Sequence, residues 1–127
     1  MEEKPANAHA DEADIRYAQR IGGPLMDFDL DGELESLRAT DSYQMTNHAA
    51  VTLVKRPGMR VVLIAMRAGG HMDEHHAHSP ITVQVLHGRI RFEVEGGALE
   101  LTPGRLIAVA EGNPHRVVGL EEGAFIL

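Results

Sequence analysis

The sequence predicts a single all-β domain, and three observations support this. After Thr40, short runs of aliphatic and β-branched residues alternate with Gly, Pro and Asn, a pattern typical of an antiparallel sandwich or barrel. The 127 residues suffice for one domain, which buries roughly two thirds of its unfolded surface in one core. The chain contains neither Cys nor Trp, so we expect an aliphatic core without disulfides or thiolate metal ligands.

Residues 1–22 are polar and acidic and predict a mobile arm, so the domain is expected to span residues 23–127. Residues 1–35 carry ten acidic and three basic side chains, whereas the remainder carries nine of each. Because acidic and basic residues are equal in number after residue 35, this part of the chain offers no strongly basic surface for a phosphate backbone. This argues against nucleic acid as a partner. The acidic N-terminal region disfavours anionic membranes. Because no basic and apolar leader precedes the domain, we expect a cytoplasmic protein.

A short helix is expected near residues 31–39, because Asp31 can cap its start, acidic residues follow in the first turn and Arg38 lies near the end. The strands are then expected at residues 51–55, 60–67, 81–86, 89–95, 98–102, 106–110, 117–118 and 124–127. Residues 89–95 alternate most cleanly, which predicts Ile90, Phe92 and Val94 inward and the charged residues outward. A turn is expected at Gly88. The outward arginines of this strand, Arg89 and Arg91, are expected to pair with acids across the sheet.

Histidines are concentrated between Gly69 and Gly88, a stretch that holds five of the eight in the chain. A further one, His115, follows Gly-Asn-Pro downstream. Imidazole is the commonest metal ligand in proteins and also titrates near neutral pH. The cluster therefore indicates either a metal site or a proton-handling site.

Residues 104–119 resemble the second motif of the cupin superfamily, which consists of small β-barrels. That motif runs Gly, five residues, Pro, one residue, Gly, two residues, His, three residues, Asn. The corresponding positions here, with the same spacing, are Gly104, Ala110, Gly112, His115 and Gly119. Ala replaces the Pro and Gly replaces the Asn. The resemblance implies a single jelly-roll barrel of the RmlC-like type.

The first cupin motif runs Gly, five residues, His, one residue, His, three or four residues, Glu, six residues, Gly, and two registers resemble it. One register keeps every spacing without the second His or the Glu: Gly69, His75, Ala77, Ile81 and Gly88. The other keeps both histidines but lies one residue too close to Gly88: Gly70, His76 and His78. No Asp or Glu lies between His78 and Gly88, so the carboxylate ligand of the family is missing in both.

Strand alternation separates two candidate ligand sets. His76 and His78 would share one face and His71 and His75 the other, unless a bulge intervenes. The first set, His76 and His78 with His115, would offer three nitrogens and open positions for water or substrate. The alternative is His75 with His115 and with His71 or Gln84. A shift of one residue would exchange the two sets.

The resemblance implies a metal-binding homodimer that acts on a small molecule. The expected cofactor is a divalent Fe, Mn, Ni, Zn or Cu ion, serving an oxygenase-, isomerase- or lyase-like reaction as a Lewis acid. The alternative is a non-catalytic cupin that binds a small ligand or acts as a sensor, with a degenerate metal site. In both cases we expect an aliphatic pocket that takes a small, partly apolar ligand.

Overall fold

The computed structural model describes residues 24–75 and 78–126 of the chain. The elements in this part are α2 (Leu30–Arg38), α3 (Asp41–Thr46), β1 (His48–Arg56), β2 (Met59–Met66), β3 (His71–His75), β4 (Ile81–Val94), β5 (Gly97–Leu101), β6 (Leu106–Val109) and β7 (His115–Ile126). The predicted β-rich fold with a short N-terminal helix is confirmed. The predicted arm, residues 1–22, lies outside the described residues, as does His76.

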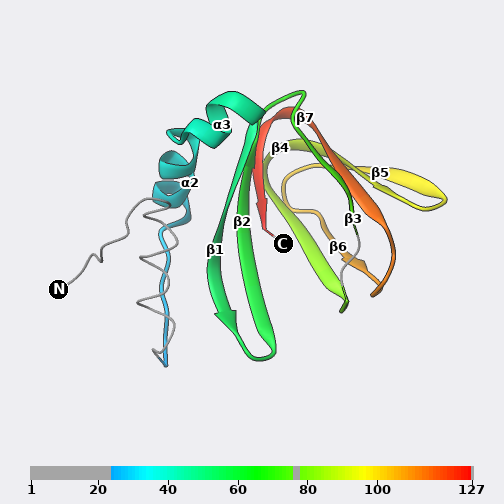
Figure 1. The fold of residues 1–127 in the computed structure, drawn as a ribbon, viewed down its shortest axis with the longest axis horizontal. Coiled ribbons are helices and arrows are strands. Elements are labelled where there is room, and N and C mark those ends of the chain that lie inside the picture. The colour runs from blue at the N-terminus through cyan, green and yellow to red at the C-terminus, as the bar shows by residue number, and fades with distance from the viewer. Residues whose placement is uncertain (1–23, 76–77, 127) are drawn as a thin grey trace.

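All strand pairs are antiparallel, and the sheet order is β1-β2-β7-β4-β5, with β3 also paired to β7 and β6 to β4. The helices lie beside β1 and β2, at the opposite end of the molecule from β5 (Figure 1). The longest of them has nine residues, far too few to cross a bilayer, and no described helix is a candidate membrane span. Two long strands, β4 and β7, pair directly with each other and with all the other described strands except β1, which pairs with β2.

Strand β4 runs without interruption through Gly88, so the expected turn at this position was wrong. Its register with β7 shifts on both sides of His87 and again before Ile90. Gly88 has a positive φ of 76°, a conformation that suits glycine and is common at bulges. The bulges bend β4 instead of ending it, so both halves of the strand remain paired with β7. The two short strands expected near the C-terminus are likewise one strand, β7.

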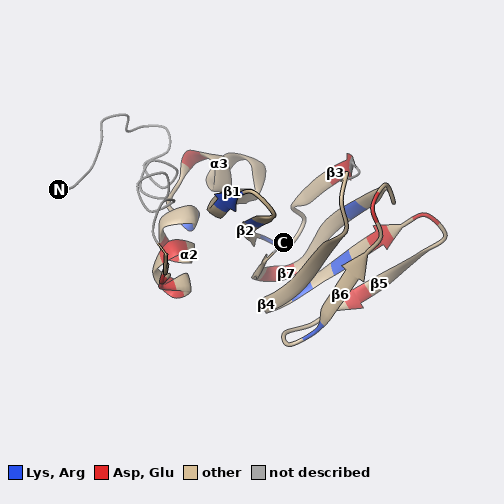
Figure 2. Ribbon diagram, turned by 90° about the horizontal axis from the view of Figure 1, so that it is seen from below, with Lys and Arg blue, Asp and Glu red and all other residues tan. Residues whose placement is uncertain are grey.

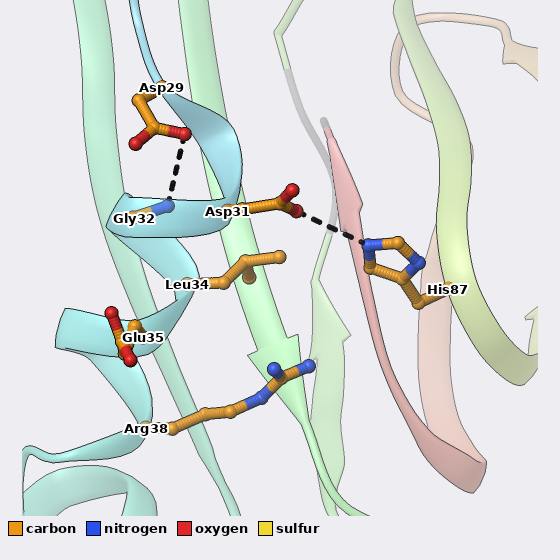
Figure 3. A pocket seen from close by; sticks show the side chains of 7 residues that line it. All are labelled: Asp29, Asp31, Gly32, Leu34, Glu35, Arg38 and His87. Carbon is orange, nitrogen blue, oxygen red and sulfur yellow. Dashed lines mark hydrogen bonds and ion pairs between the residues drawn. The ribbon is translucent and has the colours of Figure 1, made fainter.

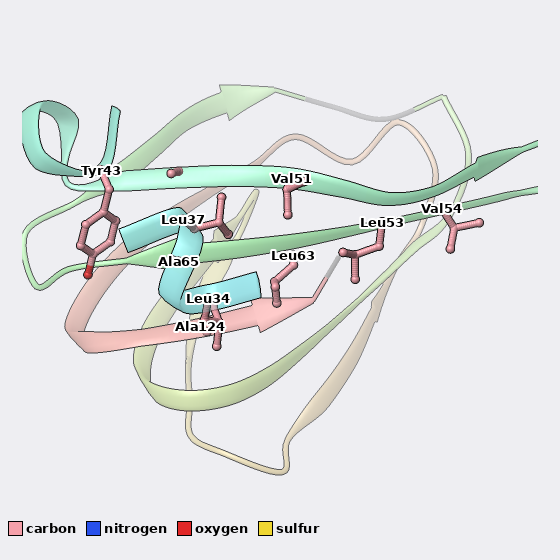
Figure 4. Close-up of a cluster of buried hydrophobic side chains, with 10 residues drawn as sticks. Leu34, Leu37, Tyr43, Val51, Leu53, Val54, Leu63, Ala65 and Ala124 are labelled. Atoms are coloured by element: carbon pink, nitrogen blue, oxygen red, sulfur yellow. The ribbon is translucent and has the colours of Figure 1, made fainter. Parts of the chain in front are cut away.

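The helices cover the outer face of β1, β2 and the end of β7 with their own apolar cluster (Figure 4). Helix α2 begins at Leu30, one residue before the predicted range, and its cap is Asp29, so the prediction of Asp31 as the cap was wrong. The Asp29 carboxylate accepts a hydrogen bond from the backbone N–H of Gly32 at 3.2 Å, and Asp31 lies in the first turn. Helix α3 was not predicted. Its Thr40 cap accepts from the N–H of Tyr43, and Asn47 ends it with a φ of 67°.

The barrel interior is the second apolar cluster, and it is aliphatic with two phenylalanines, as the composition predicted. Its buried members are Ile64, Met66, Val83, Val85, Ile90, Phe92, Leu101, Val109, Val117 and Phe125. The inward positions of Ile90 and Phe92 are therefore confirmed. On the outer face, Arg89 pairs with Glu100 at 2.7 Å and with Glu121 at 3.1 Å, among the charged bands that Figure 2 shows on β4, β5 and β7.

Tyr43 connects α3 to the sheet through a partly buried polar contact. The side chain is only 1% exposed, and its hydroxyl donates a hydrogen bond of 2.9 Å to Oε2 of Glu122 on β7. The Arg67 guanidinium lies over its ring, 4.7 Å from the centroid. Burial, followed by the Glu122 carboxylate, raises the pKa of the Tyr43 phenol above its ordinary value of about 10.

This raised pKa predicts a loss of stability at alkaline pH. Because the folded state favours the neutral phenol, its contribution is fully present below pH of about 10 and is lost as the pH rises through the raised pKa. The chain has two tyrosines, so in a Tyr17→Phe variant the phenolate absorbance reports Tyr43 alone. We expect its midpoint above 10, with a parallel fall in the free energy of unfolding that Tyr43→Phe abolishes. A midpoint at or below 10 would contradict the assignment.

Candidate functional site

His115 is the first residue of β7 and is buried, at 2% exposure. Its Nδ1 lies 3.1 Å from the backbone carbonyl oxygen of Asn113. A carbonyl only accepts hydrogen bonds, so Nδ1 carries the proton and, in the neutral ring, the lone pair is on Nε2. The Phe92 ring stacks on the imidazole, with centroids 5.3 Å apart and planes at 18°. Two contacts thus hold the orientation and the tautomer of this ring.

The row of the sheet next to His115 is apolar. In the ladders, His115 is paired with Val94 of β4 on one side and with His75 of β3 on the other. The next row inward pairs Met72 with Val117, Val117 with Phe92, and Phe92 with Leu99. Because directly opposed residues share a face of a sheet, the row beside His115 is apolar across four strands.

A bulge in β3 decides which histidine is placed opposite His115. His71 is paired with Val118, but the register then shifts between Met72 and His75, and His75 is paired with His115. Residues 115 and 118 of β7 lie on opposite faces, because they are three positions apart. His71 is accordingly on the outer side, with a 52% exposed side chain whose Nδ1 is 3.0 Å from Oδ1 of Asp73. The structure therefore does not bring His71 together with His115.

The other candidates from the sequence lie as follows. His78 is exposed, and Gln84 is exposed between Leu106 and Ile126 in the ladders. Across residues 24–74 and 78–126, no group of three or more His, Asp or Glu side chains is arranged to hold a metal ion. Among the predicted ligands whose backbone the structure describes, His75 is the one whose backbone is paired directly with that of His115.

A separate pocket of about 510 Å³ lies outside the barrel, between α2 and the bulge of β4. It is lined by Asp29, Asp31, Gly32, Leu34, Glu35, Arg38 and His87 (Figure 3). The bulge places the His87 ring opposite α2, with Nε2 3.8 Å from Oδ1 of Asp31. No sequence signal joins these residues, because the helix and the strand are about fifty positions apart.

Solved structures with a similar fold include several cupins. An RmlC-like cupin from Shewanella frigidimarina matches with a TM-score of 0.60 and 21% identity, over 64% of this chain and 73% of that one. A cupin 2 conserved barrel domain protein from Leptotrichia buccalis has a TM-score of 0.62 and 24% identity, over 66% of this chain and 41% of its own. This chain has the cupin fold. The match with a conserved Streptococcus pyogenes protein of unknown function covers 99% of this chain and 91% of that one, with 16% identity and a TM-score of 0.62.

No protein-family model and no curated protein matches the chain. The structure nevertheless explains one departure of this chain from the second motif that its sequence resembles. Gly119 replaces the Asn of the motif because the β2–β3 connection crosses directly over it. The N–H of Gly69 donates to the Gly119 carbonyl at 2.9 Å, and the N–H of Gly119 donates to the Gly70 carbonyl at 2.8 Å. A side chain at 119 would overlap the Arg67 carbonyl oxygen, so this position requires glycine.

Proposed function

We propose that this cupin binds a divalent transition metal at its barrel through Nε2 of His115 and acts there on a small molecule. The observation that carries the proposal is the hydrogen bond from Nδ1 of His115 to the Asn113 carbonyl. Metal-bound imidazoles almost always donate their second nitrogen in this way, which fixes the tautomer and turns the other nitrogen to the ion. Stacking on Phe92 adds a second restraint on the ring.

The available donors suit such an ion. His75 is paired with His115 on the neighbouring strand, and His76 and His78 follow directly in the sequence. We propose that His115 is joined by ligands from this group of three. An all-imidazole donor set without cysteine or carboxylate suits Zn, Cu, Fe or Ni. When bound, the ion would act as the Lewis acid in an oxygenase-, isomerase- or lyase-like reaction.

A second candidate function is non-catalytic binding of a small apolar ligand, and the lining of the barrel favours it. Leu99 shares the face of Phe92 but remains 53% exposed. Met72 and Val94 are partly buried beside the same cluster. In this candidate, His115 would provide a single hydrogen-bonding group within an otherwise apolar site.

Metal content distinguishes the two candidates. The purified chain is supplemented in turn with Fe, Mn, Ni, Zn and Cu, and its metal content is measured by elemental mass spectrometry. We expect it to retain about one ion per chain with at least one of these metals. His115→Gln should lower the affinity at least tenfold, the scale on which ligand-sphere changes act. His71→Ala is the matched control, because it removes a clustered histidine on the outer face, and it should retain the metal.

Two results would contradict the metal proposal. One is a chain that stays empty after every supplementation, which would leave ligand binding as the function. The other is a folded His115→Gln variant, judged by circular dichroism, that holds the ion as tightly as the parent protein.

A further inference from the structure

The connection between β1 and β2, residues 55–60, carries two cations that no described residue neutralises, and we name it the basic turn. Lys55 and Arg60 are directly opposed in the β1–β2 ladder, and both side chains are exposed. Directly opposed side chains are about 5 Å apart at Cβ, and like charges at this distance are destabilising. Neither side chain forms an ion pair with another described residue. An anionic neighbour would therefore stabilise this pair.

The described chain begins beside the basic turn. Nη2 of Arg56 lies 2.8 Å from Sδ of Met26, and Figure 1 shows the first described residues at the same end of the molecule as the turn between β1 and β2. Two exposed apolar side chains accompany them: Leu25 is 87% exposed, and Met59, which is paired with Arg56, is 56% exposed. The point at which residues 1–23 join the domain thus combines positive charge with exposed apolar surface.

An acidic tract, Asp11-Glu12-Ala13-Asp14, lies in the segment that precedes the described chain. No basic residue interrupts it, and the next residue, Ile15, is apolar. Ten residues lead from Asp14 to Pro24, a length that spans about 15 Å as a helix and about 33 Å when fully extended. Because Pro24 is only two residues from the contact of Met26 with Arg56, the tract can reach the basic turn in either conformation.

We propose that the acidic tract of the chain binds the basic turn of the same molecule. Its carboxylates pair with Lys55 and Arg60 and remove the repulsion between them, and Ile15 contacts the exposed side chain of Met59. A tethered tract has an effective concentration of about millimolar, so it has an advantage over a separate polyanion of equal charge. Exposed ion pairs are individually weak and are screened by salt, so the contact should be lost at high ionic strength.

Paramagnetic relaxation enhancement on the full ¹⁵N-labelled chain tests this proposal. The chain contains no Cys, so Ala13→Cys gives a single site for a nitroxide label within the tract. At an ionic strength of about 0.01 M, where the Debye length is about 30 Å, we expect the label to broaden the amide signals of residues 54–61. The signals of β5, at the far end of the sheet from β1, should stay sharp. In about 1 M NaCl, where the Debye length is about 3 Å, the broadening at the basic turn should be lost.

Charge variants separate binding from mere tethering near the turn. Arg60→Gln should reduce the broadening, and Lys55→Gln combined with Arg60→Gln should abolish it. Arg105→Gln is the matched control, because it removes one exposed cation outside the basic turn, and it should leave the broadening unchanged.

Four results would overturn the proposal. The first is an absence of broadening at residues 54–61, and the second is broadening that persists in the double variant or in 1 M NaCl. The third is an Arg105→Gln variant that loses as much broadening as Arg60→Gln. The fourth is broadening of equal strength when a labelled chain without ¹⁵N is mixed with an unlabelled ¹⁵N chain, because the tract of a second copy would then be the occupant.

Discussion

Replacing Gly123 with alanine is expected to lower the free energy of unfolding by about 3 kcal/mol, the upper end of the usual cost of overpacking. At this position the backbone of β7 lies very close to the bulged backbone of β4, its antiparallel neighbour. A Cβ atom on Gly123 would overlap the carbonyl oxygen of His87 and lie 2.7 Å from the Cα of Gly88. Because both neighbours are backbone atoms, the two central strands would have to move apart. That loss is a large share of the 5–15 kcal/mol typical of a domain.

Urea unfolding followed by circular dichroism measures this effect, and Gly97→Ala is its matched control. Gly97 is in β5 and has no positive φ, and a Cβ atom added to it would have no neighbouring atom within 4 Å. Alanine there should change the stability by less than about 0.5 kcal/mol. Equal unfolding midpoints for the two variants would show that the strands do not approach as closely as the structure indicates.

Replacing Phe92 with alanine is expected to cost about 3–5 kcal/mol, the usual range for a buried phenylalanine. Phe92 is 2% exposed in the barrel cluster and is packed against residues from several strands. Its removal would leave a cavity beside His115 and would also remove the stacking partner of the imidazole. The same variant should therefore broaden or shift the imidazole signals of His115 in the folded protein.

Leu99→Ala is the control for this prediction, because Leu99 is directly opposite Phe92 in the β4–β5 ladder. The side chain is 53% exposed, so its truncation should cost less than about 1 kcal/mol, since little apolar area is lost. If Leu99→Ala destabilised the protein as much as Phe92→Ala, then Phe92 would not be the buried residue of this pair and Leu99 the exposed one.

Local pattern was sufficient for most of the fold. Alternation alone placed Ile90 and Phe92 inward and Arg89 outward, because the two faces of a strand meet different environments. The early acidic residues and the last-turn arginine located α2 to within one residue, although the cap is Asp29 and not the predicted Asp31. Helix α3 escaped prediction because it has only six residues, and its one buried residue, Tyr43, is held by tertiary contacts with Glu122 and Arg67.

The sequence by itself determined the class of the protein: an all-β cupin-like barrel with an aliphatic interior, and a histidine at position 115 in a recognisable motif. Only the tertiary structure decided which residues meet. The bulge in β3 pairs His75 with His115 and leaves His71 outside, and the bulges in β4 bring His87 opposite α2. A bulge adds one residue to one strand of a pair, so it depends on how two distant segments pack and leaves no periodic trace in either of them.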